Sequence, residues 1–188
     1  MDPQTPSQMP PSAPPPNWPA PVGATAVDPK VRNLAIGMFI CAALVLIATF
    51  TSGWATAERG PASIGAGLTG IEGCFRGHCE SASWSKSKAP GDFTFIGYLG
   101  LLGGLASTGV GIALGVFGIT GKRNPIPDQV ANGVFGVTAF AFTFFTIRLM
   151  TESNAKQMSI GYSAFLGIAG IIGLGVVANM LKKARTGA

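Results

Sequence analysis

Charge is scarce in this chain, and it is unevenly placed. Asp, Glu, Lys and Arg make up 11% of the 188 residues, against about 25% in an average soluble domain. Four long apolar blocks contain no Asp, Glu, Lys, Arg or His in their interiors. Ionisable groups at mid-membrane are the usual mark of proton relays, ion-coupled transport and voltage sensing. Their scarcity argues against a pump or a secondary transporter.

Catalytic and cofactor-binding motifs are missing from the sequence as well. With a single histidine, the chain has no histidine pair to ligate haem, and it contains no His-Glu-x-x-His, Walker or Gly-x-Ser-x-Gly pattern. We therefore expect a protein that is not an enzyme, binds no cofactor and has no nucleic-acid partner.

What the chain has instead is hydrophobic length. The residues AVILMFWYC make up 47% of it and gather in four blocks, at about residues 34–51, 93–119, 130–147 and 160–181. A helix needs about 20 residues to cross the roughly 30 Å apolar core of a bilayer. The blocks predict an all-α membrane protein, in which residues 30–183 form a four-helix transmembrane bundle.

Basic residues predict how this bundle is oriented. Lys and Arg in short segments beside span ends resist translocation across the membrane. Seven of the 13 basic residues fall beside block ends on one side, at Lys30, Arg32, Lys122, Arg123, Lys182, Lys183 and Arg185. We therefore expect both termini in the cytoplasm, in a plasma or bacterial inner membrane with the lipid bilayer as a partner.

The segments outside the blocks differ sharply in composition. Residues 1–29 hold ten of the 14 prolines, which remove backbone donors and fix φ, so we expect a disordered cytoplasmic tail. Residues 184–188 are expected to form a short basic C-terminal tail. Residues 53–92 are too long for a bare connector. Their many glycines favour turning strands, which predicts a small β-rich extracytoplasmic loop domain.

That loop contains two of the three cysteines and the only histidine, in "GIEGCFRGHCE". Thiols oxidise outside the cytoplasm, so we expect a disulfide between Cys74 and Cys79. Two alternatives stay open. Cys74, His78 and Cys79 could hold a metal ion, although adjacent His and Cys side chains do not readily point at one ion. The two cysteines could also be a redox pair, which is more typically Cys-x-x-Cys.

Small residues recur four apart in the second and fourth blocks. Such residues share one helix face and let two helices approach closely. We expect helix packing at Gly100, Gly104, Gly111, Gly115, Ala169 and Gly173. The third block is bulky instead, and its phenylalanines are expected to fill the grooves that glycines leave on neighbouring helices.

Trp54 follows the first block directly, and Gly70-Ile71 precedes Cys74 and Cys79. With four spans and a long first outer loop, this pattern resembles the claudin and peripheral-myelin-protein tetraspan superfamily. In that family a tryptophan follows the first span, and a Gly-Leu-Trp segment precedes paired cysteines in a small antiparallel sheet. The chain departs from it where Glu72 replaces the second tryptophan, in its closely spaced cysteines, and in having no arginine at the start of the second span.

The resemblance implies an adhesive or barrier-like protein that self-associates through its outer loops. We expect Trp54 and Trp84 to act as loop interface residues, and the partners to be further copies of the chain or other membrane proteins. An accessory structural subunit of a larger membrane complex is the main alternative. An oligomeric channel is a weaker one, because the spans offer only a few polar side chains to line a pore: Ser107, Thr108, Thr138, Thr143 and Asn179.

Overall fold

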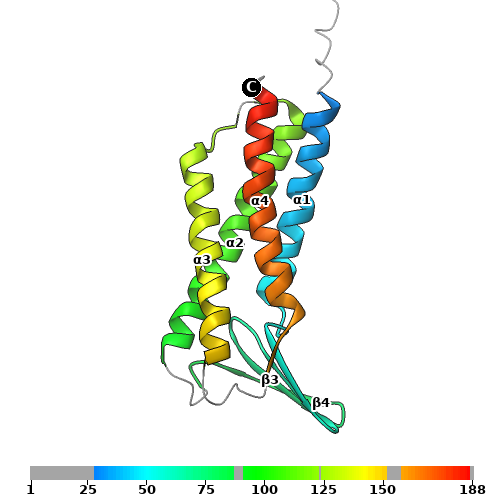
Figure 1. The fold of residues 1–188 in the computed structure, drawn as a ribbon, viewed down its shortest axis with the longest axis vertical. Coiled ribbons are helices and arrows are strands. Elements are labelled where there is room, and N and C mark those ends of the chain that lie inside the picture. Colours follow the sequence, from blue (N-terminus) through cyan, green and yellow to red (C-terminus); the bar gives the residue numbers. More distant parts are fainter. Residues whose placement is uncertain (1–27, 87–90, 123, 152–157, 187–188) are drawn as a thin grey trace, which may run out of the picture.

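Four long helices and one antiparallel sheet make up the computed structural model, which describes residues 28–86, 91–122, 124–151 and 158–186 (Figure 1). The helices are α1 (Pro29–Phe50), α2 (Gly91–Thr120), α3 (Asp128–Thr151) and α4 (Tyr162–Thr186). All four are long and apolar enough to cross a membrane. The prediction of four long apolar helices is therefore confirmed.

The first and the fourth helix each extend into a segment that was expected to be a tail. α1 begins at Pro29, where the Asp28 side chain accepts a hydrogen bond from the Lys30 amide at 2.8 Å and caps the helix. The rest of the proline-rich tail lies outside the described residues. α4 continues to Thr186, so part of the expected tail over residues 184–188 is helical. Nothing there breaks the helix, and basic side chains favour its last turn.

The helices form a ring in which α1 packs against α2 and α4, while α3 packs against α2 and less extensively against α4. Figure 1 shows the N-terminus of α1 and the C-terminus of α4 at the same end of the bundle. The sheet lies at the other end. The bundle therefore has a sheet end and a termini end.

The sheet has five strands in the order β4-β3-β2-β1-β5, all antiparallel to their neighbours. Four come from the long loop: β1 (Ala55–Arg59), β2 (Ala62–Ala66), β3 (Gly70–Phe75) and β4 (His78–Ser83). The short β5 (Ser159–Ile160) comes from the connection between α3 and α4 and pairs with β1. The loop is therefore β-rich, as expected, but the second outer connection completes its sheet.

Glycines on α2 bring this helix close to its neighbours. A Cβ added at Gly111 would lie 2.8 Å from Cδ2 of Leu174, and one at Gly115 would lie 3.0 Å from the Phe39 ring. One at Gly100 would lie 3.1 Å from the Leu68 side chain, and one at Gly104 would collide with Thr49. All four α2 glycines expected to pack therefore face other parts of this chain.

The small pair on α4 divides between two surroundings. A Cβ added at Gly173 would lie 2.6 Å from Sγ of Cys41 on α1, whereas Ala169 is exposed on the outside of the bundle. The phenylalanines of α3 divide in the same way. Phe142 is buried against Gly104 and Gly167, while Phe140 and Phe144 stack on each other on the outer surface.

Candidate functional site at the sheet end

Five aromatic side chains join the sheet to the helices: Trp54, Trp84, Phe93, Phe142 and Phe145. We call them the aromatic cluster. The ring of Trp54 meets that of Phe142 edge-on with centroids 4.8 Å apart. Trp84 stacks on Phe93 at 5.1 Å, and both rings also meet Phe145. Trp54 directly precedes β1 and Trp84 directly follows β4, whereas the three phenylalanines belong to α2 and α3, so the cluster holds the sheet against the bundle.

Both indole N–H groups of the cluster find a backbone acceptor. Trp54 donates to the Ala48 carbonyl at 2.7 Å. Trp84 donates to the carbonyls of Gly67 and Leu68, at 3.0 and 3.1 Å. A buried indole usually needs such a partner. Both tryptophans are buried, so their side chains pack between the sheet and the helices of this chain. Their expected role as loop interface residues towards a partner stays a prediction.

The backbone also approaches the helices closely at two places. The amide of Gly161 donates to the Trp54 carbonyl at 2.9 Å, and that of Ser163 donates to the Gly53 carbonyl at 3.0 Å. A side chain at Gly161 would collide with the Gly53 carbonyl, and one at Gly97 of α2 would collide with the Leu68 carbonyl. Glycine is therefore required where the sheet is seated on the bundle.

The predicted disulfide is present between Cys74 and Cys79. The two residues are directly opposite each other in the β3–β4 pair, with Cα atoms 4.0 Å apart. Arg76 and Gly77 form the two-residue turn between them, and both have positive φ, 47° and 86°. That backbone suits a tight hairpin and favours glycine. The disulfide therefore fixes the tip of the hairpin.

The metal alternative finds little support in this geometry. The ligand atoms of Glu72, Cys74 and Cys79 lie within 4.8 Å of one another, but sulfurs joined in a disulfide are not the thiolates that bind metals. Side chains alternate along a strand, so His78 lies on the opposite face of β4 from Cys79. Glu72 accepts a hydrogen bond from Ser52. A redox role for the pair stays a hypothesis.

One face of the hairpin region is apolar and open. Ile64 and Phe75 are 45% and 55% exposed, and they border a shallow hollow of about 470 Å³. Ala62, Ile64, Gly73, Phe75, His78 and Glu80 line it from alternate positions of β2, β3 and β4, and Ser63, Cys74 and Arg76 contribute to the lining as well. We call this surface the apolar face of the sheet. Arg76 lies over the Phe75 ring at 5.3 Å and adds positive charge at its edge.

The sheet also ends in an open strand. β4 pairs with β3 on one side, and it has no partner on its other side among the described residues. His78 to Ala82 are exposed along this edge. An unpaired edge can accept another strand, so the apolar face and the β4 edge together form the candidate interaction site.

Polar side chains inside the bundle are mostly used within the chain. Ser107 of α2 donates to Thr138 of α3 at 2.8 Å, and Thr138 donates to the Val134 carbonyl. Both are buried, as is Thr108. Three of the side chains considered for a pore lining are therefore placed inside the bundle. Thr143 and Asn179 are exposed.

Other features of the site were not expected from the sequence. Leu68, at the turn between β2 and β3, is buried against α2. Asp92 at the start of α2 forms an ion pair with Arg148 near the end of α3. A single large apolar residue within a glycine-rich stretch is the one signal that could have singled out Leu68. The only signal for the ion pair was that Asp92 and Arg148 have opposite charges and lie at span ends on the same side of the bundle.

Neither a protein-family model nor a curated protein matches the chain. The resemblance to the claudin superfamily therefore stays an interpretation of its layout.

Proposed function

We propose that this chain is a non-enzymatic, multi-pass membrane protein that associates with itself or with other membrane proteins through its sheet. The observation that carries the proposal is the apolar face, where Ile64 and Phe75 are exposed on a sheet clamped by a disulfide and by the aromatic cluster. Two large apolar side chains at the edge of a hollow are typical of a surface that a partner covers. A preformed surface also loses little entropy on binding.

The proposed placement puts the sheet outside the cytoplasm and both termini inside. The basic residues that flank the helices at the termini end support it, since Lys30, Arg32, Lys122 and Lys182 lie within a few residues of helix ends. A disulfide in the sheet is consistent with an oxidising compartment. Self-association at the outer surface of a plasma or bacterial inner membrane would give the adhesive or barrier-like role.

Thiol labelling tests this placement. In a Cys41→Ala background, we expect Ser85→Cys to react with an impermeant thiol reagent in intact cells, because it follows β4 at the sheet end. Asn124→Cys, between α2 and α3, should react only after detergent is added. The reverse pattern would place the sheet in the cytoplasm and contradict the proposal.

A matched pair of variants tests the interaction site. Ile64 on β2 and Thr56 on β1 belong to opposite faces of the sheet, because Thr56 pairs with Gly65, the neighbour of Ile64, and Thr56 does not line the hollow. We expect wild-type protein in mild detergent to form oligomers, measured by light scattering, and Ile64→Asp to dissociate them. Thr56→Asp adds the same charge and should leave the oligomer intact. Oligomers that survive Ile64→Asp would exclude the apolar face as the contact between copies.

An accessory subunit of a larger membrane complex is the second candidate, favoured by the outward face of α3. Gly133 and Gly136 have open space beside them, and the stacked Phe140 and Phe144 are exposed one to three turns further along the helix. Small and aromatic residues on one open helix face suit a neighbouring helix. Native mass spectrometry distinguishes the two candidates, because stoichiometric co-purification with a larger assembly supports the second.

A further inference from the structure

The termini end of the bundle contains a cavity that the proposed association does not use. It measures about 460 Å³ and lies among α2, α3 and α4. Its inner wall is apolar, with Leu114 of α2, Ala131 of α3 and Leu181 of α4, all of them buried. Its other lining residues include the polar or charged Asn132, Asn179, Lys182 and Arg185, together with the apolar Ile126, Pro127 and Ala178. The cavity is therefore amphipathic, with both hydrogen-bond donors and hydrocarbon in its lining.

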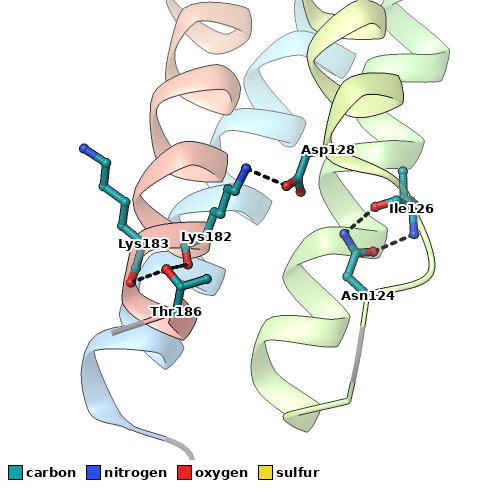
Figure 2. A network of polar contacts seen from close by, with 6 residues as sticks. All are labelled: Asn124, Ile126, Asp128, Lys182, Lys183 and Thr186. Carbon is teal, nitrogen blue, oxygen red and sulfur yellow. Dashed lines mark hydrogen bonds and ion pairs between the residues drawn. The ribbon is translucent and has the colours of Figure 1, made fainter. Parts of the chain in front are cut away.

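The charges in this cavity leave one cation without a partner. Lys182 and Asp128 form an ion pair with a 2.8 Å contact across the gap between α4 and α3 (Figure 2). Arg185, one turn further along α4, makes no ion pair with any residue in the described ranges. Two lining cations against one lining carboxylate give a local charge of +1. Asp128 is neutralised by Lys182, so the Arg185 guanidinium is the group left for an anion.

The loop before α3 holds the rim of the cavity in place. The Asn124 side chain donates to the Ile126 carbonyl at 2.9 Å and accepts from the Ile126 amide at 3.0 Å, as Figure 2 shows. Pro127 follows and lines the cavity with them. The first turn of α3 then begins at Asp128, and the partial positive charge of a helix N-terminus favours an anion nearby.

We propose that this cavity binds the headgroup of an anionic phospholipid, with its phosphate at Arg185 and its glycerol and upper acyl carbons against the apolar wall. Arginine matches phosphate geometry with two parallel donors, and basic pockets between transmembrane helices on the cytoplasmic side suit anionic headgroups. A free phosphate would gain nothing from Leu114, Ala131 and Leu181. The inference rests on the proposed membrane placement, which puts this cavity at the cytoplasmic leaflet.

Arg185 and Lys183 provide the test, because they are close on α4 and carry the same charge. Lys183 does not line the cavity, and Figure 2 shows its side chain pointing away from Asp128. Full-length protein in a neutral detergent is titrated with phosphatidylglycerol or phosphatidylcholine, and bound lipid is counted by native mass spectrometry. We expect one phosphatidylglycerol to bind in preference to phosphatidylcholine. Arg185→Gln should weaken it about fivefold, while Lys183→Gln should change it less than about twofold.

Three results would overturn the inference. Equal losses in the two variants would indicate general attraction to basic residues rather than a cavity. Equal binding of the two lipids would exclude recognition of the anionic headgroup. Glycerol phosphate that binds as well as phosphatidylglycerol would identify a soluble anion as the ligand. Circular dichroism and the intact Cys74–Cys79 disulfide check that each variant is folded.

Insertion in the membrane, which the proposed placement requires, is tested separately by alkaline carbonate extraction of membranes. A chain released by carbonate would contradict the placement itself. A chain that is retained but shows no preference for phosphatidylglycerol would overturn the lipid site alone.

Discussion

The two ends of the bundle are closed in different ways. At the sheet end, five aromatic rings, two indole hydrogen bonds and backbone hydrogen bonds to Gly53 and Trp54 hold the sheet against the helices. At the termini end, α3 and α4 are linked by one exposed ion pair across a cavity. One end of the bundle is therefore held by close packing and buried hydrogen bonds, and at the other end α3 and α4 are joined by an exposed ion pair. Substitutions should be costly at the first end and mild at the second.

The largest loss of stability is expected at the sheet end for Trp54→Ala. Its side chain is fully buried, and truncation of a buried Trp or Phe typically costs about 3–5 kcal/mol. The change also removes the indole N–H that donates to the Ala48 carbonyl. Unfolding in mixed detergent, followed by circular dichroism, measures the loss. Trp54→Phe keeps most of the packing and should lose about 1–3 kcal/mol. Wild-type stability for Trp54→Ala would contradict the contrast between the ends.

A smaller loss is expected from Gly97→Ala. The new methyl group would meet the Leu68 carbonyl, which is backbone and cannot rotate away, so overpacking should cost about 1–3 kcal/mol. Gly109 lies on the same helix with nothing within 4 Å of an added Cβ. Gly109→Ala should therefore leave stability unchanged or raise it by up to about 1 kcal/mol. Equal effects at both positions, in the same unfolding assay, would show that the sheet is not seated on α2 at Gly97.

Removing the disulfide should cost about 2 kcal/mol, the loop-entropy value for so short a ring. The effect should be local, because the bridge joins two strands that already pair. In the double variant Cys74→Ser with Cys79→Ser, hydrogen exchange should accelerate in β3 and β4 and stay unchanged in the helices. Faster exchange throughout the bundle would mean that the hairpin tip supports the whole fold.

The smallest effect is expected at the termini end, for Lys182→Gln. The side chains of Lys182 and Asp128 are 56% and 53% exposed, and ion pairs of this kind contribute about 0–1 kcal/mol. Lys183→Gln serves as the control for a lost charge on the same helix. The two variants should unfold within about 1 kcal/mol of each other. A loss at Lys182 as large as that of Trp54→Ala would remove the distinction between the two ends.

Sequence alone predicted the features that depend on local chemistry. Four blocks without interior charge predicted four long helices, and two close cysteines around Gly77 predicted the disulfide. Each of these signals can be recognised within one short continuous stretch of the sequence. The glycines Gly104 and Gly111 were assigned to helix packing for the same reason, since spacing along one helix defines a shared face.

What sequence could not predict depends on partners that are distant in the chain. β5 has only two residues, too few for any strand pattern, and it exists because β1 offers an edge. Trp54 and Trp84 were expected at an interface, but nothing local specifies that helices form the other side of it. Phe142 and Phe140 are two residues apart on α3, and only the tertiary packing places one in the core and the other outside.

The hydrogen bonds that join the chain after α1 to the start of α4 also have a consequence for the order of synthesis. Thr51 and Ser163 are 112 residues apart, yet their hydroxyl groups lie 2.6 Å from each other. The Gly53 carbonyl accepts a hydrogen bond from the Ser163 amide. A nascent chain emerges from its N-terminus, so the first helix is made long before its partner. Until β5 and α4 have been synthesised, one edge of β1 is unpaired and Trp54 lacks its contact with α4 at Gly167. The incomplete chain is therefore more exposed to strand mispairing and proteolysis than the chain in which α4 has packed.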